Sequence, residues 1–365
     1  MGDTTKALSY YQKASKMPDT YCFPFRAEEI DILESALHLN PTDAHAHYYL
    51  GNLLYEHQPE KAISLWEKAR ELNENMYIVH RNLGLAYKEV QKDYAKALAS
   101  VEKAVACNNA DPRLLYEVDA LYDLNKMSPQ KKYELLKKNF TTVKQRSETL
   151  LRLVTRSVEV GRYDEALNIM TNYAINESEG AREMQSAYLN CYTLRGMKFM
   201  KEGKFEKAIS DIQKAMDYPI GLYGRSRYAQ FNYLLGDIYF KMGNKDKANE
   251  YLNKTVEIIM DGGGADREYL YYRGMALKML GKHDEAKTSF EKMLNDVLNK
   301  RQGNAFFTQF EGGQAAELQK ATNQYLAGLA YEGLGEIEKA KEEYSETLKI
   351  NPSHIWAKVH LDSIK

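Results

Sequence analysis

Small and large apolar residues recur at fixed spacings along the chain, with charged and polar residues between them. The pattern is clearest in residues 325–352, YLAGLAYEGLGEIEKAKEEYSETLKINP, where Gly328 precedes Ala340 and Pro352 closes the unit. Apolar residues three, four and seven positions apart lie on one face of a helix. The unit therefore predicts two antiparallel helices packed through these faces and joined by a turn at Gly335.

The same pattern recurs upstream, with a glycine at unit position 8 and an alanine at position 20 where the two helices cross. Large apolar residues at positions 7, 11, 17 and 24 surround this crossing. Ala62 and Ala97 are 35 residues apart, and Ala97 and Ala166 are 69 apart, which predicts one decayed copy with its crossing residue near Lys131. The crossing alanines are Ala62, Ala97, Ala166, Ala208, Ala248, Ala286 and Ala340.

This pattern resembles the tetratricopeptide repeat, a helical hairpin with a period of about 34 residues. The resemblance implies an all-α, right-handed α-solenoid in which the first helices of successive hairpins line a concave surface. We expect N-terminal helices over 1–43, comprising a truncated repeat and a partial one. Three repeats over 44–142, the third degenerate, precede five repeats over 143–352 with longer loops, and a capping helix over 353–365.

Residues 6–14, KALSYYQKA, match the second helix of a hairpin, and only five residues precede them. A fragment of a longer protein, or a lone capping helix, would explain this. The series FPFRAEEIDIL, HYYLGNLLYEHQPEKAISLWEKA, HRNLGLAY and RGMKFMKEGKFEKAISDIQKAMDYPIGLYGRSR resembles the C-terminal half of a family of large bacterial proteins. That resemblance implies an upstream domain of unknown function similar to aldose mutarotases.

Composition excludes several classes of partner. Fifty basic and 51 acidic residues give a formal net charge of -1, whereas nucleic-acid and anionic-membrane binding need a basic surplus. No apolar run reaches the length of a membrane span, and residues 1–16 lack a signal-peptide core. Cys22, Cys107 and Cys191 have no metal-binding spacing. We expect free thiols and a cytoplasmic location, although a truncated start could have removed a signal.

No catalytic motif is present, and we expect neither enzymatic activity nor a cofactor in this chain. The glycines at 262–264 follow a predicted helix and lack the GK[ST] of a phosphate loop, so they predict a flexible connection. His47 and His80 recur at unit position 4, but no carboxylate or cysteine recurs beside them. We interpret them as packing residues rather than as metal ligands.

The concave surface is the main candidate for binding a partner. Unit position 5 holds a tyrosine in four copies, namely Tyr48, Tyr233, Tyr271 and Tyr325. Tyrosines in a row would offer flat amphipathic surface to an extended peptide. The alternative is that these side chains pack against neighbouring helices.

A carboxylate clamp is a more specific version of this site. Asn52 and Asn82 stand where some tetratricopeptide domains bind a C-terminal carboxylate, with Arg81 as a nearby cation. However, the clamp's first lysine is replaced by Tyr48, and Arg113 and Glu117 stand where the clamp has a lysine and an arginine. Glu117 would repel a carboxylate.

The longest predicted loop, residues 300–317, contains Phe306, Phe307 and Phe310. Aromatic residues are unusual in a solvated loop. The loop either folds back over the array or docks on another domain.

We therefore expect a non-catalytic protein-interaction scaffold. One alternative is an accessory module that supports an upstream carbohydrate-active domain, and another is a peptide receptor that uses the tyrosine groove.

Overall fold

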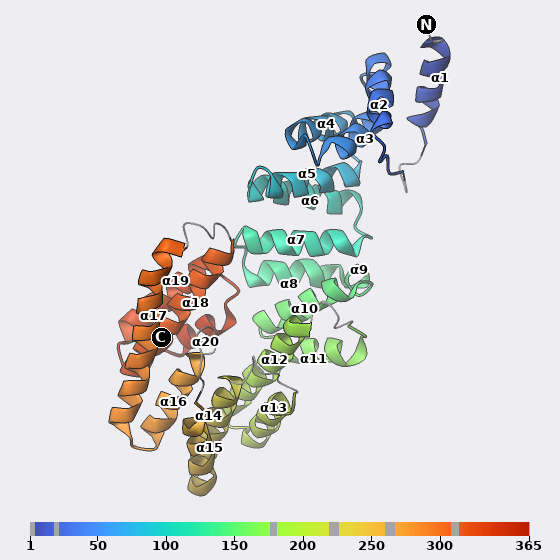
Figure 1. Cartoon of the computed structure of the whole chain (residues 1–365). Helices are drawn as coiled ribbons and strands as arrows, with labels where there is room; N and C mark the ends of the chain where they lie inside the picture. Colours follow the sequence, from blue (N-terminus) through green and yellow to red (C-terminus); the bar gives the residue numbers. More distant parts are fainter. Residues whose placement is uncertain are drawn as a thin grey trace. The chain divides into compact units, whose positions relative to one another are not determined.

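A computed structural model describes residues 4–17, 22–175, 181–218, 226–259, 267–307 and 314–364. The secondary structure of these residues is helical, without a strand among them. Figure 1 shows the helices in chain order. The chain forms two compact units, which we call unit 1 (Met1–Asn125 with Lys138–Thr149) and unit 2 (Lys126–Lys137 with Leu150–Lys365). This confirms the all-α repeat architecture that the periodic pattern predicts.

Unit 1 is built from helices that pack on their neighbours in sequence, α2 on α3, α3 on α4, α4 on α5, α5 on α6 and α6 on α7. Its helices are α1 (Thr4–Ala14), α2 (Glu28–Leu39), α3 (Ala44–Leu54), α4 (Pro59–Leu72), α5 (Tyr77–Glu89), α6 (Tyr94–Cys107), α7 (Pro112–Leu124) and α9 (Phe140–Val143).

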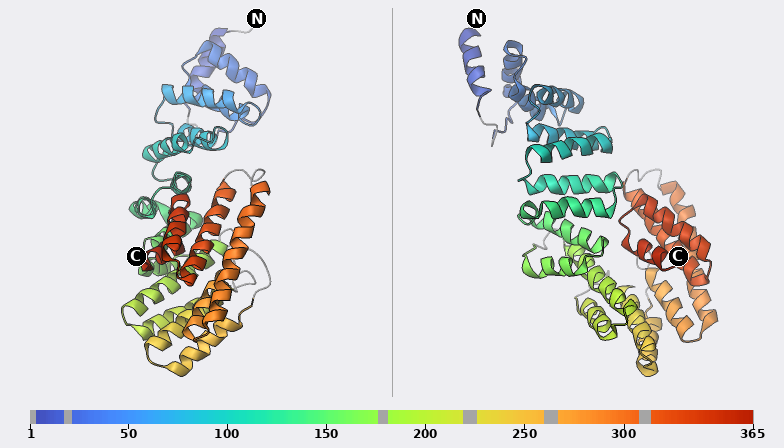
Figure 2. Two further views of the ribbon diagram at one scale, coloured as in Figure 1. Left: turned by 90° about the vertical axis from the view of Figure 1, so that its left-hand side faces the viewer. Right: turned by 180° about the vertical axis from the view of Figure 1, so that it is seen from behind.

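Unit 2 repeats this arrangement, with close pairs α12–α13, α14–α15, α16–α17 and α18–α19. Within this unit α18 also packs on α16 and α17, and α20 packs on α19, as the views in Figure 2 show. Most of unit 2 lies in α8 (Pro129–Lys138), α10 (Ser147–Glu159), α11 (Tyr163–Asn172), α12 (Ala181–Lys201), α13 (Phe205–Asp217), α14 (Ser226–Lys241), α15 (Lys245–Glu257), α16 (Glu268–Met279), α17 (His283–Phe307), α18 (Gln314–Leu334), α19 (Ile337–Ile350) and α20 (Ile355–Ser363).

The paired helices approach most closely at the glycine of unit position 8. A Cβ at Gly84 would overlap the Val101 side chain and lie 3.1 Å from the carbonyl oxygen of Ala97. Ala97 and Val101 are both fully buried. The residue at position 24 of the second helix thus fills the space that the glycine leaves, as the repeat pattern predicts.

Most turns between paired helices use a residue with positive φ, which ends the first helix. Gly161, Gly203, Gly243, Gly281 and Gly335 have φ between 72° and 83°. Lys92 and Lys126 adopt φ 54° in two hairpins that have no glycine at this place, whereas the turn between α3 and α4 has neither a glycine nor a positive φ. In those two hairpins the helix end is kept without the glycine, at the steric cost of a side chain in this region.

One local prediction is wrong. Residues 300–307 and 314–317 are helical rather than a loop, because α17 continues to Phe307 and α18 begins at Gln314. The stretch holds good helix formers and no proline, and a single Gly303 does not end a helix. In the decayed repeat the buried residue is Lys132, next to the predicted position Lys131, which is exposed.

Candidate interaction surfaces

In unit 1, the first helices of successive hairpins bring Asn52 and Asn82 into contact. The Asn82 amide donates to Asn52 Oδ1 at 3.0 Å, and Trp66 Nε1 donates to the same oxygen at 3.1 Å. Trp66 Nε1 also lies 3.2 Å from the Tyr48 carbonyl oxygen. The two asparagines therefore connect α3 to α5 and tie both to the buried Trp66 of α4.

The cation beside this pair is already engaged. Arg81 donates from Nε and from a terminal nitrogen to the Glu117 carboxylate at 2.6 to 3.0 Å. Both side chains are largely buried, with 14% and 13% of their surface exposed. Arg113 lies 3.6 Å from the same carboxylate. This bidentate ion pair joins α5 to α7.

The geometry bears on the carboxylate clamp in two ways. The structure brings Asn52 and Asn82 into contact, and Arg81 points to Glu117. However, Glu117 occupies the position on Arg81 that a ligand carboxylate would take, so a ligand would have to displace it. Binding of a C-terminal carboxylate here stays a prediction.

The tyrosines at unit position 5 do not form the open surface that the sequence predicts. Tyr48, Tyr271 and Tyr325 are 5%, 4% and 1% exposed. Tyr233 is partly buried, with its ring 5.8 Å from the ring of Tyr272. Tyr271 and Tyr325 pack against other residues of unit 2, whereas Tyr48 lies beside Tyr49 within unit 1, with ring centroids 5.1 Å apart.

Within unit 2, Tyr271 belongs to a buried polar cluster centred on Glu332 of α18. The Glu332 carboxylate accepts hydrogen bonds from Tyr271 at 2.6 Å and Tyr344 at 2.7 Å, and lies 2.9 Å from His360 Nδ1. Burial alone would raise the pKa of Glu332, but the bonds from His360 and the two tyrosines hold that pKa below its usual value. Burial and the nearby Glu332 raise the pKa of Tyr271.

His360 belongs to α20, and residues just before α20 contact helices from the start of unit 2. Lys132 Nζ of α8 donates to Ser353 Oγ at 2.8 Å, and Ser353 Oγ in turn donates to Glu159 Oε2 of α10 at 3.1 Å. Glu159 also pairs with Arg156 at 2.7 Å. A single hydroxyl thus joins residues separated by about 200 positions in the chain.

Trp356 of α20 makes the next contact. Its Nε1 donates to Asn190 Oδ1 of α12 at 3.2 Å, and Arg227 of α14 donates to that oxygen at 2.9 Å. The Arg227 guanidinium lies 5.1 Å from the Trp356 ring. The segment predicted as a capping helix thus places Trp356, Ala357 and His360 among the buried residues of unit 2.

A different surface stands out in unit 1, where large apolar side chains are exposed. Five of the nine such residues among the described side chains lie within residues 10–32: Tyr10, Met17, Phe23, Phe25 and Ile32. Phe23 and Phe25 are 71% and 78% exposed, and helix α1 has no buried residue.

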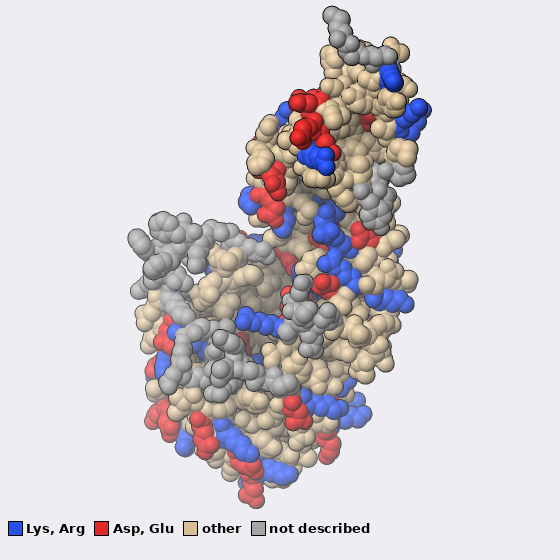
Figure 3. Space-filling view, turned by 45° about the vertical axis from the view of Figure 1, so that its right-hand side comes forward, with Lys and Arg blue, Asp and Glu red and all other residues tan. Residues whose placement is uncertain are grey.

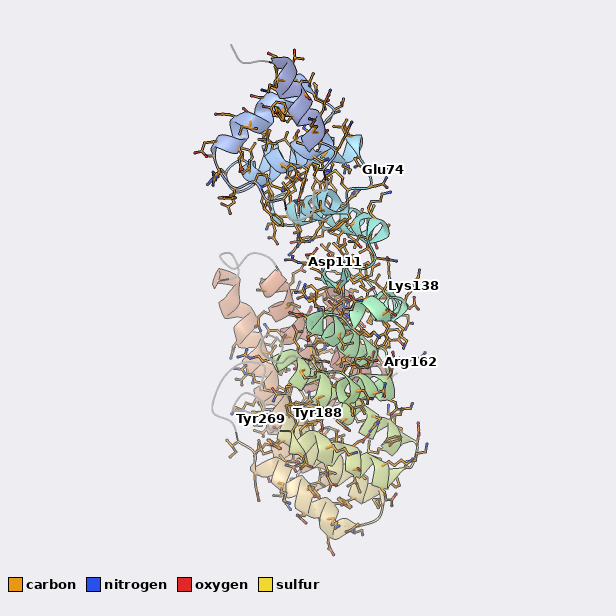
Figure 4. All side chains as sticks on the ribbon, turned by 90° about the vertical axis from the view of Figure 1, so that its right-hand side faces the viewer. Glu74, Asp111, Lys138, Arg162, Tyr188 and Tyr269 are labelled. Carbon is orange, nitrogen blue, oxygen red and sulfur yellow. The ribbon has the colours of Figure 1, made fainter. Side chains whose placement is uncertain are left out.

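The recurring histidines have a structural role. His47 Nε2 lies 3.0 Å from the Pro41 carbonyl oxygen, and His80 Nε2 lies 2.8 Å from that of Glu74. Each histidine thus fixes the turn six residues before it, and Glu74 is labelled at the turn between α4 and α5 in Figure 4. The described residues contain no cluster of three or more potential metal ligands.

The predicted docking residues lie at the end of α17. The backbone of Phe306 and Phe307 is helical, and Phe310 lies outside the described residues. Docking through these residues stays a prediction.

Lys and Arg alternate with Asp and Glu over the face drawn in Figure 3. In the part of the chain that the structure describes, no helix combines the length and apolar character needed to cross a membrane.

Comparison with known sequences identifies the repeats. Sequence models described as tetratricopeptide repeat match residues 53–112, 229–259, 268–297 and 321–354. These matches fall in both units. The chain is a helical array that contains tetratricopeptide repeats, as the recurring glycine and alanine positions predict.

Similar proteins share the repeats. A TPR repeat-containing protein of Methanocaldococcus jannaschii is 25% identical over 236 residues, which are 65% of this chain and 40% of that protein. The chain thus spans well under half the length of this relative. YrrB, a TPR protein with an unusual peptide-binding site, is 22% identical, with a TM-score of 0.39 over 51% of this chain and 91% of its own. A tetratricopeptide repeat protein from Parabacteroides merdae is 16% identical, with a TM-score of 0.43 over 80% of this chain and 99% of its own.

Proposed function

We propose that this chain is a non-catalytic scaffold that binds a protein partner, and that residues 10–32 of unit 1 form part of the contact. The observation that carries the proposal is the group of exposed aromatic and aliphatic side chains there, including Phe23 and Phe25. Exposing such side chains to water is unfavourable, and covering them is the usual source of binding energy at an interface.

The chain at Phe25 and Arg26 is also held in place. The backbone amides of Phe25 and Arg26 donate to Glu29 Oε2 at 2.7 and 2.8 Å, which fixes the chain at the start of α2. The Arg26 guanidinium lies 5.5 Å from the Phe25 ring. A surface whose backbone is already fixed loses less entropy when a partner binds.

A photo-crosslinking experiment tests this contact. We would replace Phe25 with the photoreactive residue p-benzoylphenylalanine in the full chain, expressed in its source cell, and identify adducts by mass spectrometry. We expect a defined protein adduct that is lost when Phe23→Ser is added.

Phe240 is the matched control, because it is an exposed phenylalanine (56%) in unit 2. The same probe at position 240 should not give that adduct. Equal yields of the same adducts from both positions would show nonspecific adhesion, and the proposal would then be wrong.

The second candidate is an accessory module for an upstream domain related to aldose mutarotases. The exposed side chains of residues 10–32 favour it, because such a domain would meet the chain there. An antibody raised against this chain should then detect a protein far larger than 42.0 kDa in the source cell. Activity on sugars should appear only in the longer protein. A band near 42.0 kDa would eliminate this candidate.

A further inference from the structure

The last residues of the chain bind to unit 2 through one face. Trp356 and His360 are four residues apart on one face of α20, Ser353 lies in the turn just before it, and their hydrogen bonds reach α8, α10, α12 and α18. His360 also lies edge-on to Tyr271 of α16, with ring centroids 5.3 Å apart. Anchors at this spacing are typical of an amphipathic helix bound in a groove.

Residues 353–363 lie on the inner surface formed by the first helices of the hairpins, which is the surface where the sequence predicts a ligand. Helices α10, α12, α14, α16 and α18 are first helices of their hairpins, and two of the predicted groove tyrosines, Tyr271 and Tyr325, lie against α20 or the residue before it. Residues 353–363 therefore occupy the inner surface of unit 2 in the way that a peptide ligand would.

The fit of this segment is incomplete. Arg227 Nε and the Tyr325 hydroxyl are buried without a hydrogen-bond partner among the described residues. Arg227 lies against the Trp356 ring, and the Tyr325 ring lies 4.5 Å from that of His354. Glu268 is close enough to act on both groups electrostatically, yet it gives neither a hydrogen bond. A buried donor without an acceptor weakens a complex.

We infer that residues 353–363 are an internal ligand of unit 2, and that the surface beneath them binds an amphipathic helix of a partner protein that combines an aromatic anchor with an acidic side chain. The aromatic residue would replace Trp356 between Asn190 and Arg227. The carboxylate, placed at the N-terminal end of the helix, would accept from Arg227 and Tyr325. This inference rests on the proposed scaffold function and names a second, separate surface for it.

The test uses the full chain and a fluorescently labelled synthetic peptide of residues 351–365. In the wild-type chain the tethered segment has an effective concentration in the millimolar range, so it excludes the peptide. The double variant Trp356→Ala, His360→Ala weakens the tethered copy while keeping the residues beneath it. We expect the peptide to bind this variant at least about tenfold more tightly than it binds the wild type, measured by fluorescence anisotropy.

Two peptide controls sharpen the test. A peptide with alanine in place of Trp356 should not bind either protein. A peptide with aspartate in place of His354 keeps a good helix N-cap and adds the acidic group, and it should bind the variant more tightly than the parent peptide. Weaker binding of the aspartate peptide would overturn the acidic part of the inference. A variant with wild-type helicity by circular dichroism that binds no peptide would overturn the groove itself.

Hydrogen exchange on the wild-type chain gives a second readout, which does not depend on the variant folding. Amides of α20 should exchange faster than those of α16 and α18, because a displaceable segment detaches while the helices beneath it stay folded. Equal protection in all three helices would make α20 an integral part of the core and overturn the inference. If protection is equal but the crosslinking experiment still gives a specific adduct at Phe25, only this inference is wrong and the proposed scaffold function is unaffected.

Discussion

His354 lies in a buried site, where a positively charged imidazole is unfavourable. Burial lowers the pKa of His354 from 6.5 to about 4, so the ring is neutral at physiological pH. Its Nδ1 accepts a hydrogen bond from the Ala357 amide at 3.1 Å, which caps α20. Only the unprotonated nitrogen can accept this bond. One residue thus makes the start of α20 sensitive to pH.

Replacing His354 with asparagine should remove this sensitivity. The unfolded chain takes up the proton near pH 6.5 and the folded chain only near 4, so stability that is fully present above pH 6.5 declines as the pH falls towards 4. The loss is up to about 3 kcal/mol, at about 1.4 kcal/mol per pKa unit. His354→Asn keeps an N-cap side chain but cannot be protonated. Urea unfolding at pH 7.5 and 4.5 should therefore show a smaller decrease in the variant, and equal decreases would contradict the prediction.

At the scale of the helix pair, the distance between two helices is set by a few small side chains. Gly84 lies against the Ala97 carbonyl and the Val101 side chain, so it has no room for a methyl group. Gly203, in contrast, has nothing within 4 Å of its ideal Cβ position and is needed for its φ of 72°. The repeat therefore keeps two glycines for different physical reasons, one for packing and one for the turn.

Alanine substitutions should separate these two roles. Gly84→Ala should destabilise the chain by about 3 kcal/mol, because the backbone of α6 cannot move away from a new methyl group without repacking. Gly203→Ala should destabilise the chain by about 1 kcal/mol, because an alanine is unfavourable in a left-handed backbone conformation. Combining Val101→Ala with Gly84→Ala should recover part of the stability lost by Gly84→Ala. Combining it with Gly203→Ala should recover none of the stability lost by Gly203→Ala. Thermal unfolding of the four variants measures this, and full additivity of the position 84 pair would contradict it.

At the scale of the whole molecule, unit 2 is closed by its own C-terminal residues. Lys132 is 1% exposed, and its ammonium group donates to Ser353, which also bonds to Glu159. A buried charge of this kind depends on its hydrogen bonds, because water is excluded from it. The closing contact therefore contributes to the stability of unit 2 as a whole.

Neighbouring lysines provide a matched test of this closure. Lys132→Met should destabilise unit 2 by about 2 kcal/mol, because it removes the donor to Ser353 Oγ, the hydroxyl that in turn donates to Glu159. Lys131→Met, at an exposed position one residue away, should change stability by less than about 0.5 kcal/mol. Hydrogen exchange should become faster in α10 and α20 of the first variant. Equal effects of the two substitutions would show that the contact is unimportant.

The sequence predicts the features that depend on near neighbours. Gly84 and Ala97 belong to one hairpin, so their spacing alone identifies the crossing of two helices. The contact between Lys132 and Ser353 spans 221 positions, and no spacing rule reports it. The same limit explains the tyrosines: the sequence predicts an open surface for Tyr271, because it gives no sign that α20 covers this residue. Glu332, at unit position 12 of an inner helix, was the one available signal for the buried cluster.

The bond between Lys132 and Ser353 also has a consequence during protein synthesis. At roughly 5 to 20 residues per second, the 221 positions between them take about 10 to 45 s to translate. Throughout that time the nascent chain carries Lys132, Asn190 and Arg227 without the segment that later covers them. Unit 2 can therefore complete its fold only after residues 353–363 have been translated, and until then its inner surface is accessible to chaperones.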